Sequence, residues 1–243
     1  MPTNRKQIII LGEIKLVIEL ASFCHSSSYS IVTSPSNDKI ALPDFCLQKK
    51  QLPKTALCAF ELTNTNNESK KRNLLLLEKT LPTDTIIYSS SVATTVTEQS
   101  HWLQYPERLI GISALPTLLK NKLIEVAISI HISNDTLSTA KHFFTTIGKE
   151  TSIVQDRVGM VLPRILCMLI NEAYFALMED VTNPADIDLA MKLGTNYPQG
   201  PIQWSQLIGL NHVVTILDAI HQDSGEERYR VAPLLRQLAR NIY

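Results

Sequence analysis

The chain has 243 residues, with 23 lysines and arginines against 23 aspartates and glutamates, so its formal net charge is zero. This balance excludes a generally basic surface, and we expect no binding to nucleic acid or to an anionic membrane. The length suits one large or two modest domains. Since no apolar run could cross a membrane or form the core of a signal peptide, the sequence predicts a cytoplasmic protein.

The first two thirds of the chain alternate short apolar segments with helical patterns. Strands are expected at residues 7–11, 30–33, 56–62, 85–88, 109–112, 123–128 and 151–154. Helices are expected at residues 14–23, 68–79 and 136–147. Strands that alternate with helices predict a mostly parallel, doubly wound α/β sheet.

The last third of the chain has the pattern of a helical domain. Apolar residues recur at helical spacing over residues 161–177, which places them on one face of a long helix. Asn183 is a candidate N-cap for a second helix that Gly194 is expected to end. After a proline-rich turn, one further helix is expected through residues 208–217.

This helical region resembles the C-terminal domain of 3-hydroxyacyl-CoA dehydrogenases. The matching blocks are Asn171-Glu172-Ala173, residues 186–194, residues 197–201 and residues 207–210. The resemblance implies a degenerate Rossmann-like domain at residues 1–155, followed by a helical C-terminal dehydrogenase and dimerisation domain at residues 156–243. The activity that it implies is NAD-dependent oxidation of 3-hydroxyacyl-CoA in fatty-acid metabolism.

The glycine pattern argues against a dinucleotide site. Gly12 follows the first expected strand, where a G-x-G-x-x-G turn would begin, and no other glycine precedes Gly111. Ile14 and Val17 hold the second and third glycine positions, so their branched side chains occupy space that the cofactor needs. We therefore expect no cofactor, and NAD is implied by the resemblance alone.

The resemblance also identifies individual cofactor contacts. The family's acid at the end of the second strand has no counterpart, although Asp38 lies nearby in a turn-rich segment. The family's glutamate after the third strand corresponds to Thr65, whereas its lysine is retained as Lys70. Within Lys70-Lys71-Arg72, however, a solvated basic face is the interpretation that the sequence favours. The candidate cofactor-binding residues are Gly12, Lys70 and Ser90.

The catalytic positions can be compared because residues 56–163 align with the family without gaps. Ser113 stands at the position of the family's catalytic histidine. Oxidation of a secondary alcohol needs a base with a pKa near the working pH, and an unassisted serine cannot serve. Glu125 corresponds to the glutamate that orients that histidine; alternatively, it points to solvent from a sheet edge.

Substrate contacts are also replaced. A serine of the family corresponds to Val92, and its substrate-binding asparagine corresponds to Pro163, which also predicts a helix start near Leu162. Residues 34–52 are too few for the pair of helices with which the family contacts coenzyme A. The four scattered cysteines predict buried reduced thiols, and neither they nor the histidines have metal-ligand spacing.

Three hypotheses follow for function. The first is a non-catalytic pseudoenzyme that binds a partner or an acyl-CoA-type ligand. The second is an oxidoreductase with altered substrate or cofactor use, with Ser113, Glu125 or His131 in new roles. The third is a partner subunit of an active relative. Since the helix at 161–177 is apolar on more than one face, a homodimer through the C-terminal helices is also expected.

Overall fold

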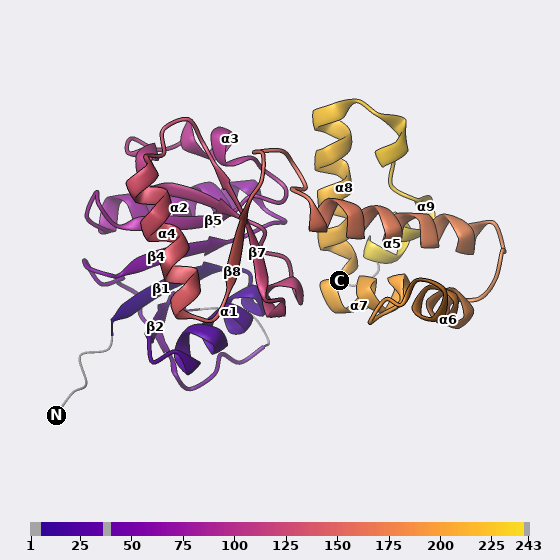
Figure 1. Cartoon of the computed structure of the whole chain (residues 1–243), viewed down its shortest axis with the longest axis horizontal. Coiled ribbons are helices and arrows are strands. Elements are labelled where there is room, and N and C mark those ends of the chain that lie inside the picture. Colours follow the sequence, from indigo (N-terminus) through magenta and orange to yellow (C-terminus); the bar gives the residue numbers. More distant parts are fainter. Residues whose placement is uncertain (1–5, 36–39, 241–243) are drawn as a thin grey trace. The chain divides into compact units, whose positions relative to one another are not determined.

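The computed structural model describes residues 6–35 and 40–240, and the chain divides into two compact units, Met1–Arg157 and Val158–Tyr243 (Figure 1). The boundary expected from the sequence, after residue 155, lies two residues before this division. Asp38, considered above as a ribose ligand, lies outside the described residues.

Within its described residues, the first unit contains an eight-stranded sheet with the order β3-β2-β1-β4-β5-β6-β7-β8. The strands are β1 Gln7–Gly12, β2 Ser30–Thr33, β3 Cys46–Gln48, β4 Cys58–Leu62, β5 Ile86–Ser90, β6 Leu109–Ile112, β7 Leu123–Ile128 and β8 Glu150–Ile153. All neighbours are parallel except β6 and β7. The predicted mostly parallel sheet is therefore confirmed. Strand order reverses between β1 and β4, which is where open α/β sheets bind ligands.

Helices connect these strands and cover the sheet (Figure 1). They are α1 Ile14–Ser26, α2 Asn67–Thr80, α3 Val96–Ser100 and α4 Asn134–Thr146, with 3₁₀ turns at Pro106–Arg108 and Leu118–Lys120. α1 and α4 share one apolar core with the sheet, in which Phe60 and Tyr88 stack at 4.7 Å between ring centroids. The sequence did not predict β3 or α3, because each is too short to show a period.

The second unit is helical. Its elements are α5 Leu162–Met178, α6 Pro184–Thr195, α7 Pro201–Ile208, α8 Leu210–Ser224 and α9 Pro233–Arg240, with a 3₁₀ turn at Glu227–Tyr229. The predicted start of α5 near Leu162 is confirmed, and Asn183 caps α6 by accepting two backbone hydrogen bonds.

Two helix boundaries in this unit were wrongly predicted. Gly194 lies inside α6, which ends at Asn196 in the left-handed conformation with φ of 56°. Gly209 divides the single helix that was expected into α7 and α8, because its φ of 103° is incompatible with a helix. Apolar spacing continues across Gly209, so the periodic pattern alone gave no sign of the break.

Two of the blocks that resemble the family hold α7 in place. Asp188 Oδ1 accepts a hydrogen bond from Ile202 N at 2.8 Å, and Oδ2 accepts one from Gln203 N at 3.0 Å. A Cβ atom at position 200 would lie 2.1 Å from Asp188 Oδ1, so only glycine fits there. The carboxylate therefore caps α7, where a negative charge is favoured.

A third block ties α5 to the segment before α9. Asn171 Nδ2 donates to Arg230 O at 2.9 Å, and Asn171 Oδ1 accepts from Ala232 N at 2.8 Å. Asn171 is 2% exposed; its hydrogen bond with Ala232 N is buried and that with Arg230 O is partly buried. The residues that carry the resemblance in this unit thus have internal structural roles.

No helix in the described part of the chain is long and apolar enough to cross a membrane. The four cysteines are free and buried, as predicted. Burial raises the pKa of the Cys24 and Cys167 thiols to about 12, so these groups stay protonated at neutral pH. Among the described residues, no group of three or more His, Cys, Asp or Glu side chains could hold a metal ion.

Candidate functional site

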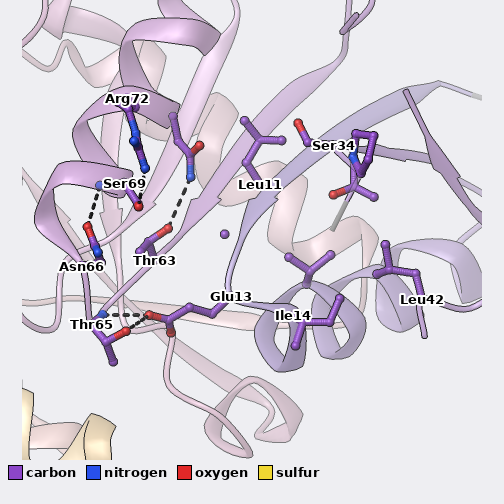
Figure 2. A pocket seen from close by; sticks show the side chains of 15 residues that line it. Leu11, Glu13, Ile14, Ser34, Leu42, Thr63, Thr65, Asn66, Ser69 and Arg72 are labelled. Atoms are coloured by element: carbon purple, nitrogen blue, oxygen red, sulfur yellow. Dashed lines mark hydrogen bonds between the residues drawn. The ribbon is translucent and has the colours of Figure 1, made fainter. Parts of the chain in front are cut away.

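A cavity of about 360 Å³ opens beyond the carboxyl ends of β1 and β4. Its wall is formed by the Gly12 turn, the start of α1, the segment after β2, the turn after β4 and one side of α2 (Figure 2). This is the point where the strand order reverses, so its place in the fold is that of a ligand site.

Gly12 has a structural reason to be glycine. Its φ is 131°, and a Cβ atom there would lie 2.5 Å from the carbonyl carbon of Leu62. The two residues are partners in the parallel pairing of β1 with β4, so the backbones meet at this turn. The close approach of the strands accounts for Gly12 without any cofactor.

The second and third positions of the glycine fingerprint lie in the wall of the same cavity. Ile14 and Val17 both line it, and Val17 is 2% exposed because its side chain belongs to the core beneath α1. Apolar side chains thus fill the space that glycines at these positions would leave free, including the space for a cofactor's pyrophosphate.

Glu13 follows directly and was not singled out from the sequence. Its Oε1 accepts a hydrogen bond from Asn64 N at 2.9 Å. It also accepts hydrogen bonds from Thr65 N at 2.7 Å and from Thr65 Oγ1 at 2.7 Å (Figure 2). The sequence feature that could have drawn attention to Glu13 is the position of a carboxylate immediately after the glycine of the turn. Its partners lie more than fifty residues away, so the sequence could not reveal the contact.

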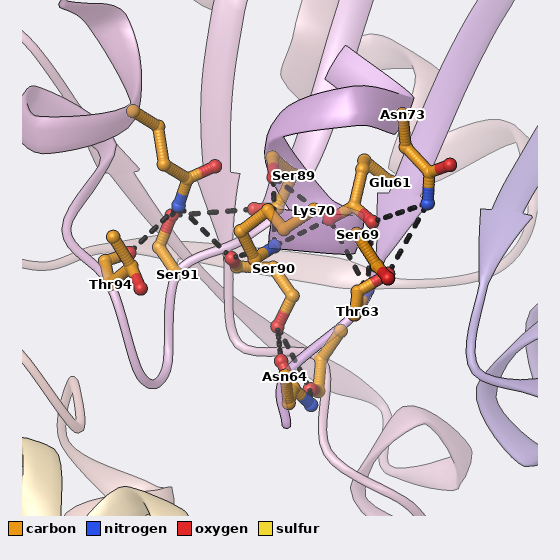
Figure 3. A network of polar contacts seen from close by, with 12 residues as sticks. Glu61, Thr63, Asn64, Ser69, Lys70, Asn73, Ser89, Ser90, Ser91 and Thr94 are labelled. Carbon is orange, nitrogen blue, oxygen red and sulfur yellow. Dashed lines mark hydrogen bonds and ion pairs between the residues drawn. The ribbon is translucent and has the colours of Figure 1, made fainter. Parts of the chain in front are cut away.

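Lys70 does not belong to a solvated face, so that prediction was wrong. The side chain is 1% exposed, and Nζ lies 2.5 Å from Glu61 Oε2 and 2.9 Å from Ser90 O (Figure 3). The reason is Glu61, which is fully buried at the end of β4 and supplies the opposite charge. Lys71 and Arg72, in contrast, are exposed as expected.

The Glu61 carboxylate has further partners that reach the cavity wall. Thr63 N donates to Oε1 at 3.1 Å, and Asn73 Nδ2 donates to the same oxygen at 3.1 Å. Thr63 and Asn73 both line the cavity, whereas Lys70 is not part of its lining. The retained lysine therefore supports the wall from inside the core.

Ser90 is fully buried within the same polar network. Its Oγ donates to Asn64 Oδ1 at 2.6 Å, and Asn64 Nδ2 donates to Ala114 O at 2.8 Å (Figure 3). Val92, two residues later, is buried and offers no hydrogen bond. The hydroxyl of Ser90 at the end of β5 is thus hydrogen-bonded to Asn64 after β4, and Asn64 in turn is hydrogen-bonded to the segment after β6.

Ser113 and Glu125 are brought together as backbone neighbours. Ser113 N donates to Glu125 O at 3.1 Å, and Ser113 Oγ accepts a hydrogen bond from Glu125 N at 3.1 Å. Glu125 is 6% exposed, so the interpretation in which it points to solvent is wrong. The residue lies in β7, between β6 and β8, and pairs with Ser152 of β8.

Two other positions from the sequence analysis lie in different units of the chain. His131 is exposed in the turn after β7, and its backbone N–H donates a hydrogen bond to Ser129 Oγ at 3.3 Å. Pro163 occupies the first turn of α5 and is buried within the second unit.

Comparison with known proteins places this geometry in a family context. The family model for the NAD binding domain of 3-hydroxyacyl-CoA dehydrogenase matches residues 35–157, and that for the C-terminal domain of the same enzyme matches residues 159–242. The NAD-binding match begins after β2, so it leaves out the Gly12 turn.

Relatives in sequence carry related descriptions. The chain is 33% identical over 172 residues to a probable 3-hydroxybutyryl-CoA dehydrogenase of Bacillus subtilis, covering 71% of this chain and 60% of the relative. It is 32% identical over 174 residues to a 3-hydroxybutyryl-CoA dehydrogenase of Bradyrhizobium diazoefficiens, covering 71% and 59%. The matched region thus spans about 60% of the length of these relatives.

Solved structures show the same fold. The (S)-3-hydroxybutyryl-CoA dehydrogenase from Ralstonia eutropha superposes with a TM-score of 0.80 at 21% identity, covering 99% of this chain and 95% of that one. FadB2 of M. tuberculosis superposes with a TM-score of 0.84 at 14% identity, covering 98% and 95%.

Proposed function

The chain belongs to the 3-hydroxyacyl-CoA dehydrogenase family, and we propose that it is a non-catalytic member that acts by binding an acyl-CoA-type ligand or an active relative. The observation that carries this proposal is the state of Ser113 at the position of the catalytic base. Its hydroxyl oxygen already accepts the backbone N–H of Glu125. A group in that position must take the proton of the substrate hydroxyl, and a serine without an assisting base does not.

The other positions support the same proposal. Val92 and Pro163 cannot form the side-chain hydrogen bonds that the family's serine and asparagine provide. Lys70, which corresponds to the family's lysine, and Ser90, the other polar candidate, have polar groups that bind Glu61, Asn64 and the backbone. The chemical groups of the site are therefore either replaced or used to hold the fold.

We expect no NADH production from 3-hydroxybutyryl-CoA and NAD at high protein concentration. Loss of a general base alone typically lowers a rate by about 10²–10⁴-fold, and the substrate contacts are replaced as well. The measurement is absorbance of NADH, with Ser113→Ala and Glu125→Ala as paired variants. Turnover that either variant abolishes would contradict the proposal, and turnover that survives both would place an active site elsewhere.

A second candidate function is an oxidoreductase of the same family with altered substrate or cofactor use. It is favoured by the cavity at the Gly12 turn and by the buried carboxylate of Glu125 beside Ser113. Calorimetric titration separates the two candidates, since an oxidoreductase must bind a redox cofactor. Sub-millimolar binding of NADH or NADPH would favour this second candidate over the first.

We also propose that the protein is a homodimer built through α5. Leu162 is 40% exposed and Ile165 is 53% exposed, and helical spacing places them on the same face of α5. A shallow cavity of about 340 Å³ beside it is lined by Ile165, Met168 and Leu169. Exposed apolar area of this kind on a helix is typical of an interface core, where methionine is common.

Light scattering is expected to give about twice the 27.2 kDa mass of one chain at tens of micromolar. Met168→Lys should dissociate the dimer, because it introduces a charge where an apolar partner surface is expected. The matched control is Ile130→Lys, which replaces an apolar residue that is 93% exposed in the first unit. A wild-type mass near that of one chain, or a dimer indifferent to Met168→Lys, would contradict this interface.

A further inference from the structure

The turn after β4 directs three hydrogen-bond donors at a single point. They are the backbone amides of Asn64 and Thr65 and the hydroxyl of Thr65, and all three reach Glu13 Oε1 within 2.9 Å. Figure 2 shows the two contacts of Thr65. Several N–H and O–H donors around one charged oxygen are the arrangement by which proteins bind phosphate and carboxylate groups. Here the bound oxyanion is a side chain of the protein itself.

The place of this contact gives it a consequence for ligands. Glu13 follows Gly12, and both line the cavity beyond the carboxyl ends of β1 and β4. In folds of this class that region receives the phosphates of a nucleotide. A phosphate that entered would meet a carboxylate already bound to the available donors.

The charged side chains of the cavity wall support the same consequence. Among the described residues that line it, Glu13 and Arg72 are the charged ones, so the wall is balanced as it stands. Arg72 Nη2 donates to Ser69 Oγ at 2.8 Å, which keeps the guanidinium at the cavity side of α2. Without the Glu13 carboxylate, the wall would carry a net positive charge and a set of open donors.

We infer that Glu13 is an internal anion that occupies the oxyanion position of this cavity and thereby keeps the phosphate groups of a nucleotide out of it. Removal of its side chain should then create a site for a single phosphate group. The inference rests on the proposed function in one respect, because it explains how this member would come to refuse a dinucleotide. It differs from the steric effect of Ile14 and Val17, which would persist after Glu13 is changed.

The experiment compares variants at one position with a charge control. Glu13→Ala and Glu13→Ser remove the carboxylate and free the donors, whereas Glu13→Gln removes the charge but keeps an oxygen that can accept from them. Glu68→Ala removes one negative charge from the exposed first turn of α2, the helix that carries Arg72. Each folded protein is titrated by calorimetry with ADP and, in parallel, with adenosine.

We expect Glu13→Ala and Glu13→Ser to bind ADP about ten-fold or more tightly than the wild type does, the effect of one charge-assisted hydrogen bond. Adenosine should show no such gain. The affinity of Glu13→Gln for ADP should stay close to that of the wild type, because the glutamine oxygen still occupies the donors. The affinity of Glu68→Ala should also be unchanged, because the removed charge is not the one that binds these donors.

Several results would overturn the inference. Folded Ala and Ser variants that do not gain affinity for ADP would show that other side chains close the site. Equal gains for ADP and adenosine would show that the new space, not an oxyanion position, binds the ligand. Thermal unfolding shows whether each variant is folded. If only one of Glu13→Ala and Glu13→Ser folds, the ADP affinity of that variant tests the inference.

A titration of the wild type with NADH keeps this inference separate from the proposed function. Tight NADH binding by the wild type would defeat the non-catalytic proposal and the inference together. A wild type that binds no NADH, with Glu13 variants that bind no ADP, would leave the proposed function standing and remove only the role of Glu13.

Discussion

Lys70→Met is expected to lower the free energy of unfolding by about 3–5 kcal/mol, because it leaves a buried carboxylate without its counter-charge. Glu61 is fully buried and Lys70 is 1% exposed, so water cannot replace the lost partner. Methionine keeps the volume and the apolar stem of lysine. The expected loss therefore comes from the charge and the hydrogen bonds to Glu61 and Ser90, not from a cavity.

Urea unfolding followed by circular dichroism measures this effect. Lys71→Met is the matched control, because Lys71 is the next residue of α2 and is exposed; a change of less than about 0.5 kcal/mol is expected there. Adding Glu61→Gln to Lys70→Met should recover part of the loss, since the pair is then removed together.

If Lys70→Met and Lys71→Met cost the same, the ion pair would not stabilise the fold. Lys70 would then be free to serve a ligand, as the family resemblance implies. A large cost for Lys70→Met instead means that the buried pair alone requires this lysine, so its presence is no evidence for a cofactor.

The same distinction separates what the sequence could predict from what it could not. Strands such as β1 and β6 were predicted closely because each contains a continuous run of buried, mostly apolar residues, which can be recognised from the local sequence. Lys70 was misread because its burial depends on Glu61, nine residues away on another element. In the local sequence of α2, Lys70 is one of three consecutive basic residues, and nothing distinguishes it from the exposed Lys71 and Arg72.

The candidate site follows the same rule. Replacements at Ser113, Val92 and Pro163 can be predicted from the sequence, because the family resemblance implies a residue type at each of these positions. The contact of Glu13 with Asn64 and Thr65 was not visible, since it depends on how closely the ends of β1 and β4 approach. A sequence pattern therefore predicts changes of residue type at single positions, whereas contacts between distant elements require the structure.

Gly12→Ala is expected to destabilise the first unit by about 3 kcal/mol or more, the sum of a strained backbone and an overpacked contact. The added Cβ would lie 2.5 Å from the carbonyl carbon of Leu62, and backbone atoms on both sides belong to paired central strands. Neither strand can move away without breaking the hydrogen bonds between β1 and β4.

Gly148→Ala is the matched control for this last prediction. Gly148 also has a positive φ, of 74°, but nothing lies within 4 Å of its added Cβ, so only the backbone strain is tested. That strain should cost about 1–2 kcal/mol. Urea unfolding of both variants shows how much more the Gly12 variant loses through its contact with Leu62 and through its φ of 131°, which L residues adopt less readily than 74°. If the two variants lose the same free energy, the approach of β1 to β4 does not require glycine. Gly12 would then need a ligand to explain it, and the cavity beside it would again be a candidate nucleotide site.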